Sequence, residues 1–429
     1  YKEQTGEPSQ AQITAFEDTW HWGLESEKAL QEIFASPIAP AAVKDFMSVM
    51  PKFLGKKTDM AAYLTMMCVR LLELRRILKD TGSIYLHCDP TASHYLKIAM
   101  DTIFGAPNFR NEIVWKRMTS SGFKGKTSIG KSHDVLLNYS KSNDFLYNSV
   151  YVPYSDKYLN ERFNKVDENK RRFKDEKIGT ATSQATIDRL KAEGKIYITS
   201  SGKLRIKHYL DEIKGVPLDD VWYDIPPINS QASERLGYPT QKPEILLERI
   251  IKASSNEGDI VLDPFCGCGT ALVVAHKLNR KWIGIDITHL AISTMKWRLE
   301  KMFPNIQYKV IGEPKDLESA KELANQNKYQ FQLWAVSLIG GQPYGDKKKG
   351  ADTGIDGYLY FMDEKNKVKK AIISVKSGHV MVTQVKDLIA TVKREKAEMG
   401  VFLTLEVPTK PMEYEATIEG FYHSPLGKD

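Results

Sequence analysis

The sequence predicts an α/β fold, and three of its features indicate this class. Apolar segments of strand length alternate with helical segments at residues 59–139 and again at residues 243–286, which is typical of layered α/β domains. A glycine-rich turn at residues 263–270 joins one such strand to the next helix. Asp286 ends the following strand, as acidic residues do in nucleoside-binding βαβ units. Because 429 residues exceed the usual size of one core, we expect two or three domains.

The first part of the fold is predicted at residues 59–139. Residues 59–79 form an expected helix, and Gly82 follows as a stop signal. The apolar residues at helical spacing are Leu64, Met67, Leu71, Leu74 and Leu78. The elements expected next are a buried strand at residues 83–88, a helix at residues 93–104, and strands at residues 112–115 and 135–139.

A separate lobe is predicted between residues 141 and 237, where aliphatic residues become scarce. Basic and aromatic residues are interleaved there, and residues 203–209 alternate cation and apolar residue along an expected strand. The alternation suits a phosphate-facing strand edge, but a solvated charged surface is equally well supported because acids are mixed in. Residues 219–235 are expected to return to the core, with Trp222 as a packing residue rather than a wedge between bases.

The second part of the α/β pattern is one βαβ unit. The expected elements are a helix at residues 243–253, a strand at residues 260–263, a helix at residues 271–278 and a strand at residues 282–286. In such a unit the ligand lies beyond the carboxyl ends of the strands, where a glycine turn exposes backbone N–H groups. This pattern on its own predicts a nucleoside site.

Two details of the turn favour one class of nucleoside. Its sequence, Asp-Pro-Phe-Cys-Gly-Cys-Gly-Thr at residues 263–270, differs from the three-glycine phosphate fingerprint, and the chain has no Gly-Lys-Ser/Thr loop. A pyrophosphate is therefore not the expected guest. Asp263 at the strand tip suits a cationic or amino-bearing ligand, and S-adenosylmethionine, a sulfonium nucleoside with a free α-amino group, fits that chemistry.

Three motifs together carry a family resemblance. Tyr-Pro-Thr-Gln-Lys-Pro at residues 238–243, the turn at residues 263–270 and Gly-Ile-Asp at residues 284–286 resemble the β-class DNA amino-methyltransferases, which modify adenine N6 or cytosine N4. The resemblance implies a Rossmann-like S-adenosylmethionine-dependent methyltransferase fold with an inserted DNA-recognition lobe. It also implies double-stranded DNA as the partner, with adenine N6 as the favoured acceptor, in a restriction-modification or related context.

The resemblance assigns cofactor-binding residues. It implies that the methionine end is lined by Thr240, Lys242 and Pro243. It implies that the cofactor is wrapped by Asp263, Phe265, Gly267, Gly269 and Thr270, with Asp286 on the ribose. Cys266 and Cys268 invite a metal hypothesis, but with one spacer residue and no nearby partner they are expected to be small residues in a tight turn.

The catalytic tetrapeptide of the resembled family is absent from the sequence. That family uses Asp/Asn/Ser-Pro-Pro-aromatic to bind the acceptor amine and stack on the extruded base. Ile-Pro-Pro-Ile at residues 225–228 lacks both the polar and the aromatic residue. Because the family's order places the tetrapeptide ahead of a region that residues 60–89 resemble, we expect it to precede Tyr1. Residues 16–20 resemble the segment after this motif in fused adenine enzymes, which favours adenine N6. The chain alone is then expected to bind cofactor without transferring a methyl group.

The C-terminal segment has a second resemblance. After an expected linker or exposed helix at residues 313–328, Asp356 precedes a strand at residues 358–361 and Lys376 ends a strand at residues 371–376. The arrangement resembles the Mrr-like branch of the PD-(D/E)xK nucleases, a restriction-endonuclease-like α/β domain, and implies Asp356, Ser374 and Lys376 as the site, with Asp356 binding Mg²⁺.

Substitutions in that segment leave its activity open. Ser374 replaces a carboxylate or carboxamide, Gln332 stands where a helix often supplies Glu, and Asp352 is the remaining helper for the metal. Three alternatives follow: Mg²⁺-dependent cleavage of DNA, a DNA-binding or allosteric remnant, and an unrelated small α/β domain.

The whole chain is predicted to have four parts. They are a catalytic half at residues 1–140, a target-recognition lobe at residues 141–237, a cofactor-binding half at residues 238–312, and a linker with the nuclease-type domain at residues 313–429. Two other classes compete with a methyltransferase: a nucleotide-dependent oxidoreductase and a non-catalytic DNA-binding module.

Composition bounds the setting of the protein. The net charge of +7 permits a polyanionic partner without requiring one. No apolar run approaches the roughly 18 residues of a membrane span, and the four cysteines lack the spacing of a zinc site or a secreted disulfide framework. We therefore expect a cytoplasmic protein with no membrane contact, and we leave a homodimer open.

Overall fold

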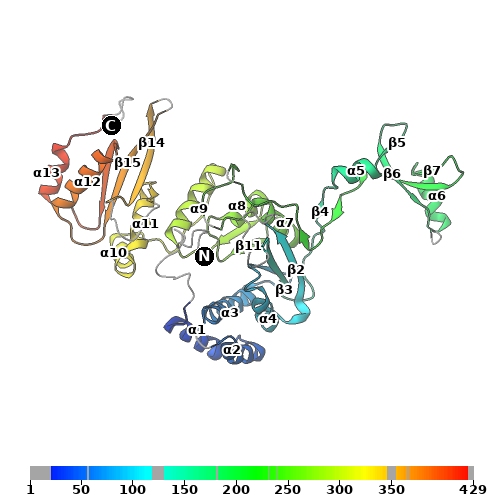
Figure 1. The fold of residues 1–429 in the computed structure, drawn as a ribbon, viewed down its shortest axis with the longest axis horizontal. Coiled ribbons are helices and arrows are strands. Elements are labelled where there is room, and N and C mark those ends of the chain that lie inside the picture. Colours follow the sequence, from blue (N-terminus) through cyan, green and yellow to red (C-terminus); the bar gives the residue numbers. More distant parts are fainter. Residues whose placement is uncertain are drawn as a thin grey trace.

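The computed structural model describes residues 21–55, 58–117, 130–179, 182–229, 231–238, 240–344, 354–364 and 367–423. The chain forms a central α/β body, an arm that extends from it, and a C-terminal α/β body (Figure 1). In the described ranges no helix is long and apolar enough to cross a membrane. The predicted α/β class is confirmed.

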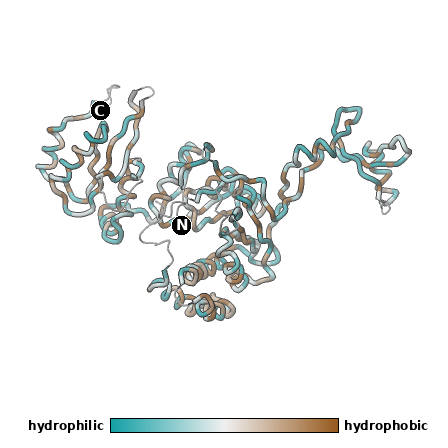
Figure 2. The backbone as a smooth tube through the Cα atoms, viewed as in Figure 1, coloured by the Kyte–Doolittle hydropathy of each residue, from teal (hydrophilic) through white to brown (hydrophobic). Residues whose placement is uncertain are grey.

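A helical layer covers one side of the central body. Figure 2 shows apolar stretches along its helices, and its core contains Leu64, Leu71, Met100 and Ile103. The helices are α1 (Leu24–Ala35), α2 (Ala41–Phe53), α3 (Asp59–Ile77) and α4 (Ser93–Phe104). The predictions for α3 and α4 are confirmed, because their apolar residues recur with the helical period and pack inward.

A four-stranded sheet lies against this helical layer. Its order is β1-β3-β2-β10, with only the β2–β10 pair parallel. The strands are β1 (Ser83–Cys88), β2 (Phe109–Lys116, after the short η1 helix Ala106–Asn108), β3 (His133–Ser140) and β10 (Val221–Trp222). Strand β10 is the expected return to the core. Trp222 is buried and its indole N–H donates to the Asp219 carbonyl at 2.7 Å, which confirms a packing role.

The predicted βαβ unit forms the other half of the central body. Strands β11 and β12 pair in parallel, with Asp263 opposite Gly284. The elements are α7 (Glu244–Ser254), β11 (Ile260–Asp263), α8 (Thr270–Lys277), β12 (Lys281–Gly284) and α9 (His289–Met302). The expectation that the second strand reaches Asp286 is wrong. The chain turns there because the Asp286 carboxylate accepts hydrogen bonds from two backbone N–H groups.

The arm is joined to the central body by a two-stranded stalk, β4 (Tyr151–Val152) with β9 (Val216–Pro217). It carries a sheet of order β5-β6-β8-β7. The remaining elements are α5 (Asp156–Arg162), β5 (Lys165–Val166), β6 (Arg172–Lys177), α6 (Gln184–Ala192), β7 (Ile196–Ile198), β8 (Leu204–Tyr209) and η2 (Leu210–Glu212). Residues 203–209 contain the expected strand, but the expected edge position is wrong, because β8 pairs on both sides.

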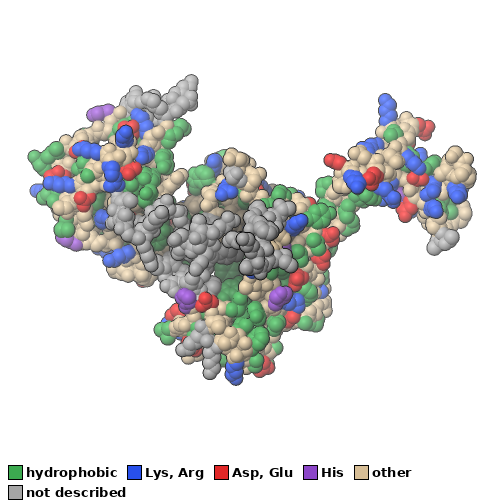
Figure 3. Space-filling view, viewed as in Figure 1, with side chains coloured by type: hydrophobic (Ala, Val, Ile, Leu, Met, Phe, Trp, Pro, Cys, Tyr) green, Lys and Arg blue, Asp and Glu red, His purple; other side chains and the backbone are tan. Residues whose placement is uncertain are grey.

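Cations of β8 are held over the sheet by neighbouring side chains. Lys207 Nζ lies 5.4 Å from the Phe173 ring centroid, and Arg205 lies 3.8 Å from the Asp175 carboxylate. Figure 3 shows Lys and Arg side chains on the arm mixed with Asp and Glu. The arm therefore offers a surface of mixed charge, as one of the two sequence-based alternatives had it.

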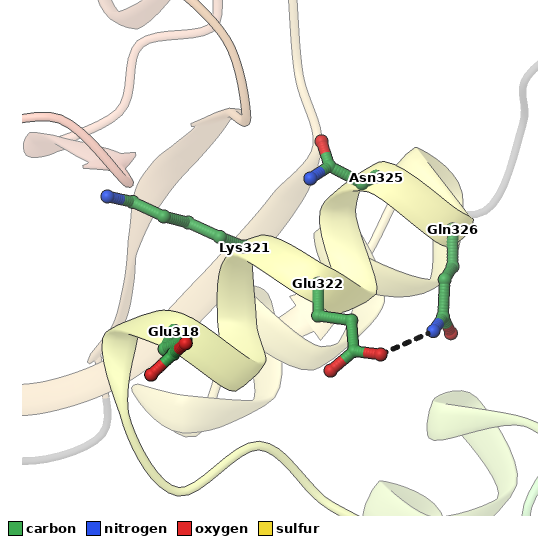
Figure 4. A pocket seen from close by; sticks show the side chains of 5 residues that line it. All are labelled: Glu318, Lys321, Glu322, Asn325 and Gln326. Atoms are coloured by element: carbon green, nitrogen blue, oxygen red, sulfur yellow. Dashed lines mark hydrogen bonds between the residues drawn. The ribbon is translucent and has the colours of Figure 1, made fainter.

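The C-terminal body is a sheet of order β13-β14-β15-β16 with helices packed on it. Its elements are α10 (Leu317–Gln326), α11 (Lys328–Leu338), β13 (Gln342–Pro343), β14 (Gly357–Glu364), β15 (Lys367–Lys376), α12 (Val382–Arg394), β16 (Met399–Thr404) and α13 (Lys410–Ile418). The expected exposed helix exists as α10, which buries Ala320 and Ala324 against α11. The outer side of α10 bears a polar, open hollow (Figure 4).

Substitution of Gly269 tests how tightly the glycine turn is packed. Its φ is +74°, and a Cβ there would lie 2.5 Å from Met295 Cγ. We expect Gly269→Ala to lower the free energy of unfolding by about 1–3 kcal/mol more than the left-handed backbone alone explains. The matched control is Gly258→Ala, with φ +81° and nothing within 4 Å, which should cost only about 1–2 kcal/mol. Equal losses in urea unfolding would contradict the clash.

Candidate functional site

The glycine turn lies at the carboxyl ends of β11 and β12. Asp263 Oδ1 accepts the Phe265 N–H at 3.1 Å, and the Gly269 N–H donates to the Cys266 carbonyl at 2.7 Å. Gly267 and Gly269 both have positive φ, 49° and 74°, a backbone region that glycine enters without steric cost. The turn therefore leads directly from the strand into α8.

Asp286 fixes the turn from the other strand. Its Oδ2 accepts the Gly267 N–H and its Oδ1 accepts the Thr288 N–H, both at 2.9 Å. A carboxylate offers about four acceptor sites, so about two of them remain for other donors. The structure thus brings together the predicted residues of the turn and the predicted acid.

The Asp263 carboxyl is partly desolvated. Burial raises its pKa, the negative charge of Asp286 raises it further, and the Phe265 N–H and the charge of Lys242 oppose the rise. Burial lowers the pKa of Lys242, while Asp134 and Asp263 raise it and Arg117 lowers it. The carboxyl of Asp263 and the amine of Lys242 are therefore close to each other, and both are partly desolvated.

The predicted segment at residues 240–243, which contains Lys242, lies near the glycine turn. Thr240 has φ +62°, which is strained for a β-branched residue, and its carbonyl accepts from Lys242 Nζ at 2.9 Å. Pro243 then occupies the N-cap position of α7 without a side-chain capping bond. Pro239 of the same motif lies outside the described residues.

Arg298 connects that segment to the turn. This arginine of α9 is buried and donates to the Cys268 carbonyl at 3.2 Å, to Thr270 Oγ1 at 3.1 Å and to Glu244 Oε1 at 2.9 Å. Glu244 follows Pro243 directly. One buried cation therefore holds the start of α7 against the start of α8. Its role was not predicted from the sequence, because an arginine in an amphipathic helix usually faces solvent.

The two cysteines of the turn are buried within it. Cys266 Sγ donates to the Ile285 carbonyl at 3.2 Å, and Cys268 Sγ lies 3.7 Å from Thr270 Oγ1. Burial raises the pKa of both thiols. No group of three or more His, Cys, Asp or Glu able to hold a metal ion occurs in the described part of the chain.

A histidine–carboxylate pair lies next to this site. His87 Nε2 is 2.9 Å from Asp134 Oδ2, and Arg117 Nε is 3.2 Å from Asp134 Oδ1. Burial lowers the pKa of His87, with Asp134 opposing and the charges of Lys242 and Arg117 assisting. Burial raises the pKa of Asp134, but His87, Arg117 and Lys242 together hold it below its ordinary value.

This pair was not predicted from the sequence. The available signal was a histidine near the carboxyl end of the strand at residues 83–88, followed far along the chain by an aspartate at the start of the antiparallel strand. Their pairing depends on strand register, which the apolar pattern alone did not provide.

The second predicted site lies in the C-terminal body. Asp356 is buried; its Oδ1 accepts from Gln332 Nε2 at 2.6 Å and its Oδ2 accepts the Val375 N–H at 2.7 Å. Ser374 is buried on β15, and Lys376 ends that strand, partly exposed. Asp356 thus contacts β15 as predicted, and each of its oxygens accepts one hydrogen bond from the protein. Asp352 lies outside the described residues.

Comparisons with known proteins match two segments of the chain. A DNA methylase family matches residues 42–296, more than half of the chain. A family described as NACHT-associated inactive Restriction Endonuclease 1 matches residues 329–423.

Among curated proteins, the Type II methyltransferase M.EcaI of Enterobacter cloacae is 34% identical over 261 residues, covering 56% of this chain and 57% of its own length. The DNA adenine methyltransferase YhdJ of Escherichia coli (strain K12) is 30% identical over 218 residues, covering 51% and 60% respectively. The chain thus spans little more than half the length of these two relatives.

Among solved structures, the cytosine-N4-specific PvuII DNA methyltransferase has a TM-score of 0.37 at 12% identity, covering 66% of this chain and 79% of its own. The M1.HpyAVI–SAM complex has a TM-score of 0.31 at 18% identity, covering 55% and 82%.

His87 supplies a pH-dependent prediction. Its pKa is lowered in the folded chain, so below about pH 6.5 the unfolded chain binds a proton that the folded chain does not, and stability falls as pH falls. Between pH 7.5 and pH 5.5 the free energy of unfolding of the wild-type chain should fall. We expect this fall to be about 1 kcal/mol smaller in His87→Gln. Thermal midpoints across this range measure it. His94→Gln, which removes an exposed imidazole, is the control and should keep the wild-type slope; a wild-type slope in His87→Gln would refute the assignment.

Proposed function

The chain belongs to the DNA methylase family, and on that premise we propose that its site holds S-adenosylmethionine for methyl transfer to an exocyclic amine of a DNA base. When bound, this cofactor supplies a methyl group activated by a sulfonium centre. We propose adenine N6 as the acceptor, supported by the similarity to a protein named as a DNA adenine methyltransferase. The arm is the part that we propose reads double-stranded DNA.

The arrangement of Asp263, Lys242 and Asp286 around one turn carries the proposal. The amino-acid end of the cofactor has one ammonium and one carboxylate. An ammonium would compensate the partly buried Asp263, whose pKa is raised, and a carboxylate would compensate Lys242, whose pKa is lowered. The remaining acceptor sites of Asp286 suit ribose hydroxyl groups, which are hydrogen-bond donors. The residues present therefore fit the cofactor.

We further propose that residues 1–429 alone bind the cofactor without completing methyl transfer. They contain no Asp/Asn/Ser-Pro-Pro-aromatic sequence to bind the acceptor amine. At residues 225–228, Ile225 is buried in the core and its carbonyl accepts the Trp115 indole N–H at 2.9 Å. That segment therefore supports the sheet and offers no polar side chain to a base.

For the C-terminal body we propose a remnant of a nuclease fold that does not cleave DNA. Gln332 and Val375 donate to the two oxygens of Asp356, so a Mg²⁺ ion would share each oxygen with a hydrogen-bond donor of the protein. Ser374 adds no charge to the site. The description of the matching family as inactive supports the same conclusion.

Calorimetric titration of the full chain with S-adenosylmethionine tests the cofactor site. Asp286→Asn should weaken binding about tenfold or more. The amide oxygen can accept from only one side, so one of the two backbone N–H groups that now donate to Asp286 would face the amide NH₂ group, which is also a donor. The control is Asp188→Asn on the exposed α6, which should bind like wild type. Wild-type chain that binds NAD instead of S-adenosylmethionine would overturn the proposal.

Transfer is tested with radiolabelled cofactor and duplex DNA. The chain should bind the cofactor and leave the DNA unlabelled, whereas a longer polypeptide with the tetrapeptide placed before residue 1 should label adenine. Labelling by residues 1–429 at a rate comparable to that of the longer polypeptide would show that the acceptor amine is activated by other residues.

Addition of Mg²⁺ or of a metal chelator tests the proposal that the C-terminal body does not cleave DNA. Either addition should leave both the thermal midpoint and the integrity of duplex DNA unchanged, because Asp356 already accepts two hydrogen bonds from the protein and the neighbouring Ser374 adds no charge. Lys376→Ala is measured in parallel. Mg²⁺-dependent cleavage that Lys376→Ala abolishes would restore the nuclease alternative.

A further inference from the structure

The two matched segments meet where α9 packs against α11. Helix α9 follows directly after the cofactor acid Asp286, and α11 is the first helix of the segment that matches the inactive nuclease family. This junction is therefore a direct contact between the proposed cofactor site and the C-terminal body.

Gln330 of α11 makes the polar contact at this junction. Its side chain is 5% exposed, and its Oε1 accepts the His289 N–H at 3.1 Å. His289 is the first residue of α9, where backbone N–H groups have no partner within the helix. Gln330 thus caps, from one body, a helix that belongs to the other.

The loop before α9 is fixed from its other end by Asp286. Asp286 Oδ1 accepts the Thr288 N–H, and Thr288 Oγ1 accepts the Ala291 N–H at 2.8 Å. The adjacent residues Thr288, which precedes α9, and His289, which begins it, therefore bond to the cofactor acid and to Gln330. We expect displacement of either residue to shift the carboxylate that we assign to the ribose.

The cost of keeping Gln330 in place indicates that the cap matters. Its Nε2 is buried and has no hydrogen-bond partner within the described residues. A buried amide donor without a partner costs roughly 1–3 kcal/mol, and an apolar residue of the same shape would avoid that cost. What Gln330 contributes in return is the acceptor for His289.

We propose that Gln330 is a positioning residue of the cofactor site, through which the docked C-terminal body holds the Asp286 loop in its binding geometry. The inference rests on the proposed binding of S-adenosylmethionine. Because coupling between two sites is reciprocal, cofactor binding also strengthens the docking of α11 on α9. The C-terminal body then acts on methyl-donor binding without any chemistry of its own.

The test compares two substitutions in the full chain. Gln330→Met keeps the shape and removes the acceptor, so it should weaken S-adenosylmethionine binding roughly fivefold and speed amide exchange at residues 286–291. Gln330→Glu keeps an acceptor at a helix N-terminus, where negative charge is favourable, and should bind within about twofold of wild type. The matched control, Gln326→Met, alters an exposed residue of α10 (Figure 4) and should match wild type.

Each outcome decides the inference. Weakened binding in Gln330→Met that Gln330→Glu restores supports it. Wild-type affinity in Gln330→Met, or equal weakening in both variants, overturns it. Either result would show that cofactor affinity does not depend on the acceptor that residue 330 offers to the His289 N–H. If the wild-type chain binds no S-adenosylmethionine, the proposed function fails. Amide exchange at residues 286–291 still decides whether Gln330 holds the loop: faster exchange in Gln330→Met supports the cap, and unchanged exchange overturns it.

Discussion

The central body depends on one carboxylate that accepts two backbone N–H groups from different segments. Asp286 joins Gly267 of the glycine turn to Thr288 at the start of α9. Each N–H would otherwise lack a partner where the chain reverses, at a cost of about 1–3 kcal/mol if buried. The carboxylate therefore fixes the distance between the ends of two parallel strands, and the proposed ribose site exists because that distance is fixed.

Several strands of the central body could be predicted from the sequence, because their signals are local. Residues 260–263 and 83–88 are apolar runs of strand length, and the observed strands have those same bounds. The end of β12 was predicted two residues too late, because the exposed isoleucines that continue the apolar pattern past Gly284 resemble strand residues. The hydrogen bonds of Asp286 that turn the chain there are not visible in a pattern of hydropathy.

The features that could not be predicted depend on contacts between distant segments. His87 meets Asp134 only through the register of β1 with β3. Arg298 is buried only because Glu244 and the Cys268 carbonyl converge on it. Strand β8 carries an alternation that suits an edge, yet it pairs on both sides, and its cations lie over a ring and beside a carboxylate. Periodicity identifies elements well, but it does not specify their partners.

The stalk of the arm has a consequence for how such a protein can change. Because β4 and β9 pair antiparallel, with Val152 opposite Val216, the chain leaves and re-enters the central body at adjacent points. Gly215 makes this closeness possible, since a Cβ there would lie 2.4 Å from the Val152 carbonyl oxygen. An insertion with adjacent ends can be exchanged for another of different length without moving the strands beneath it. Recombination at these two points would give the same central body a different arm in a single genetic event.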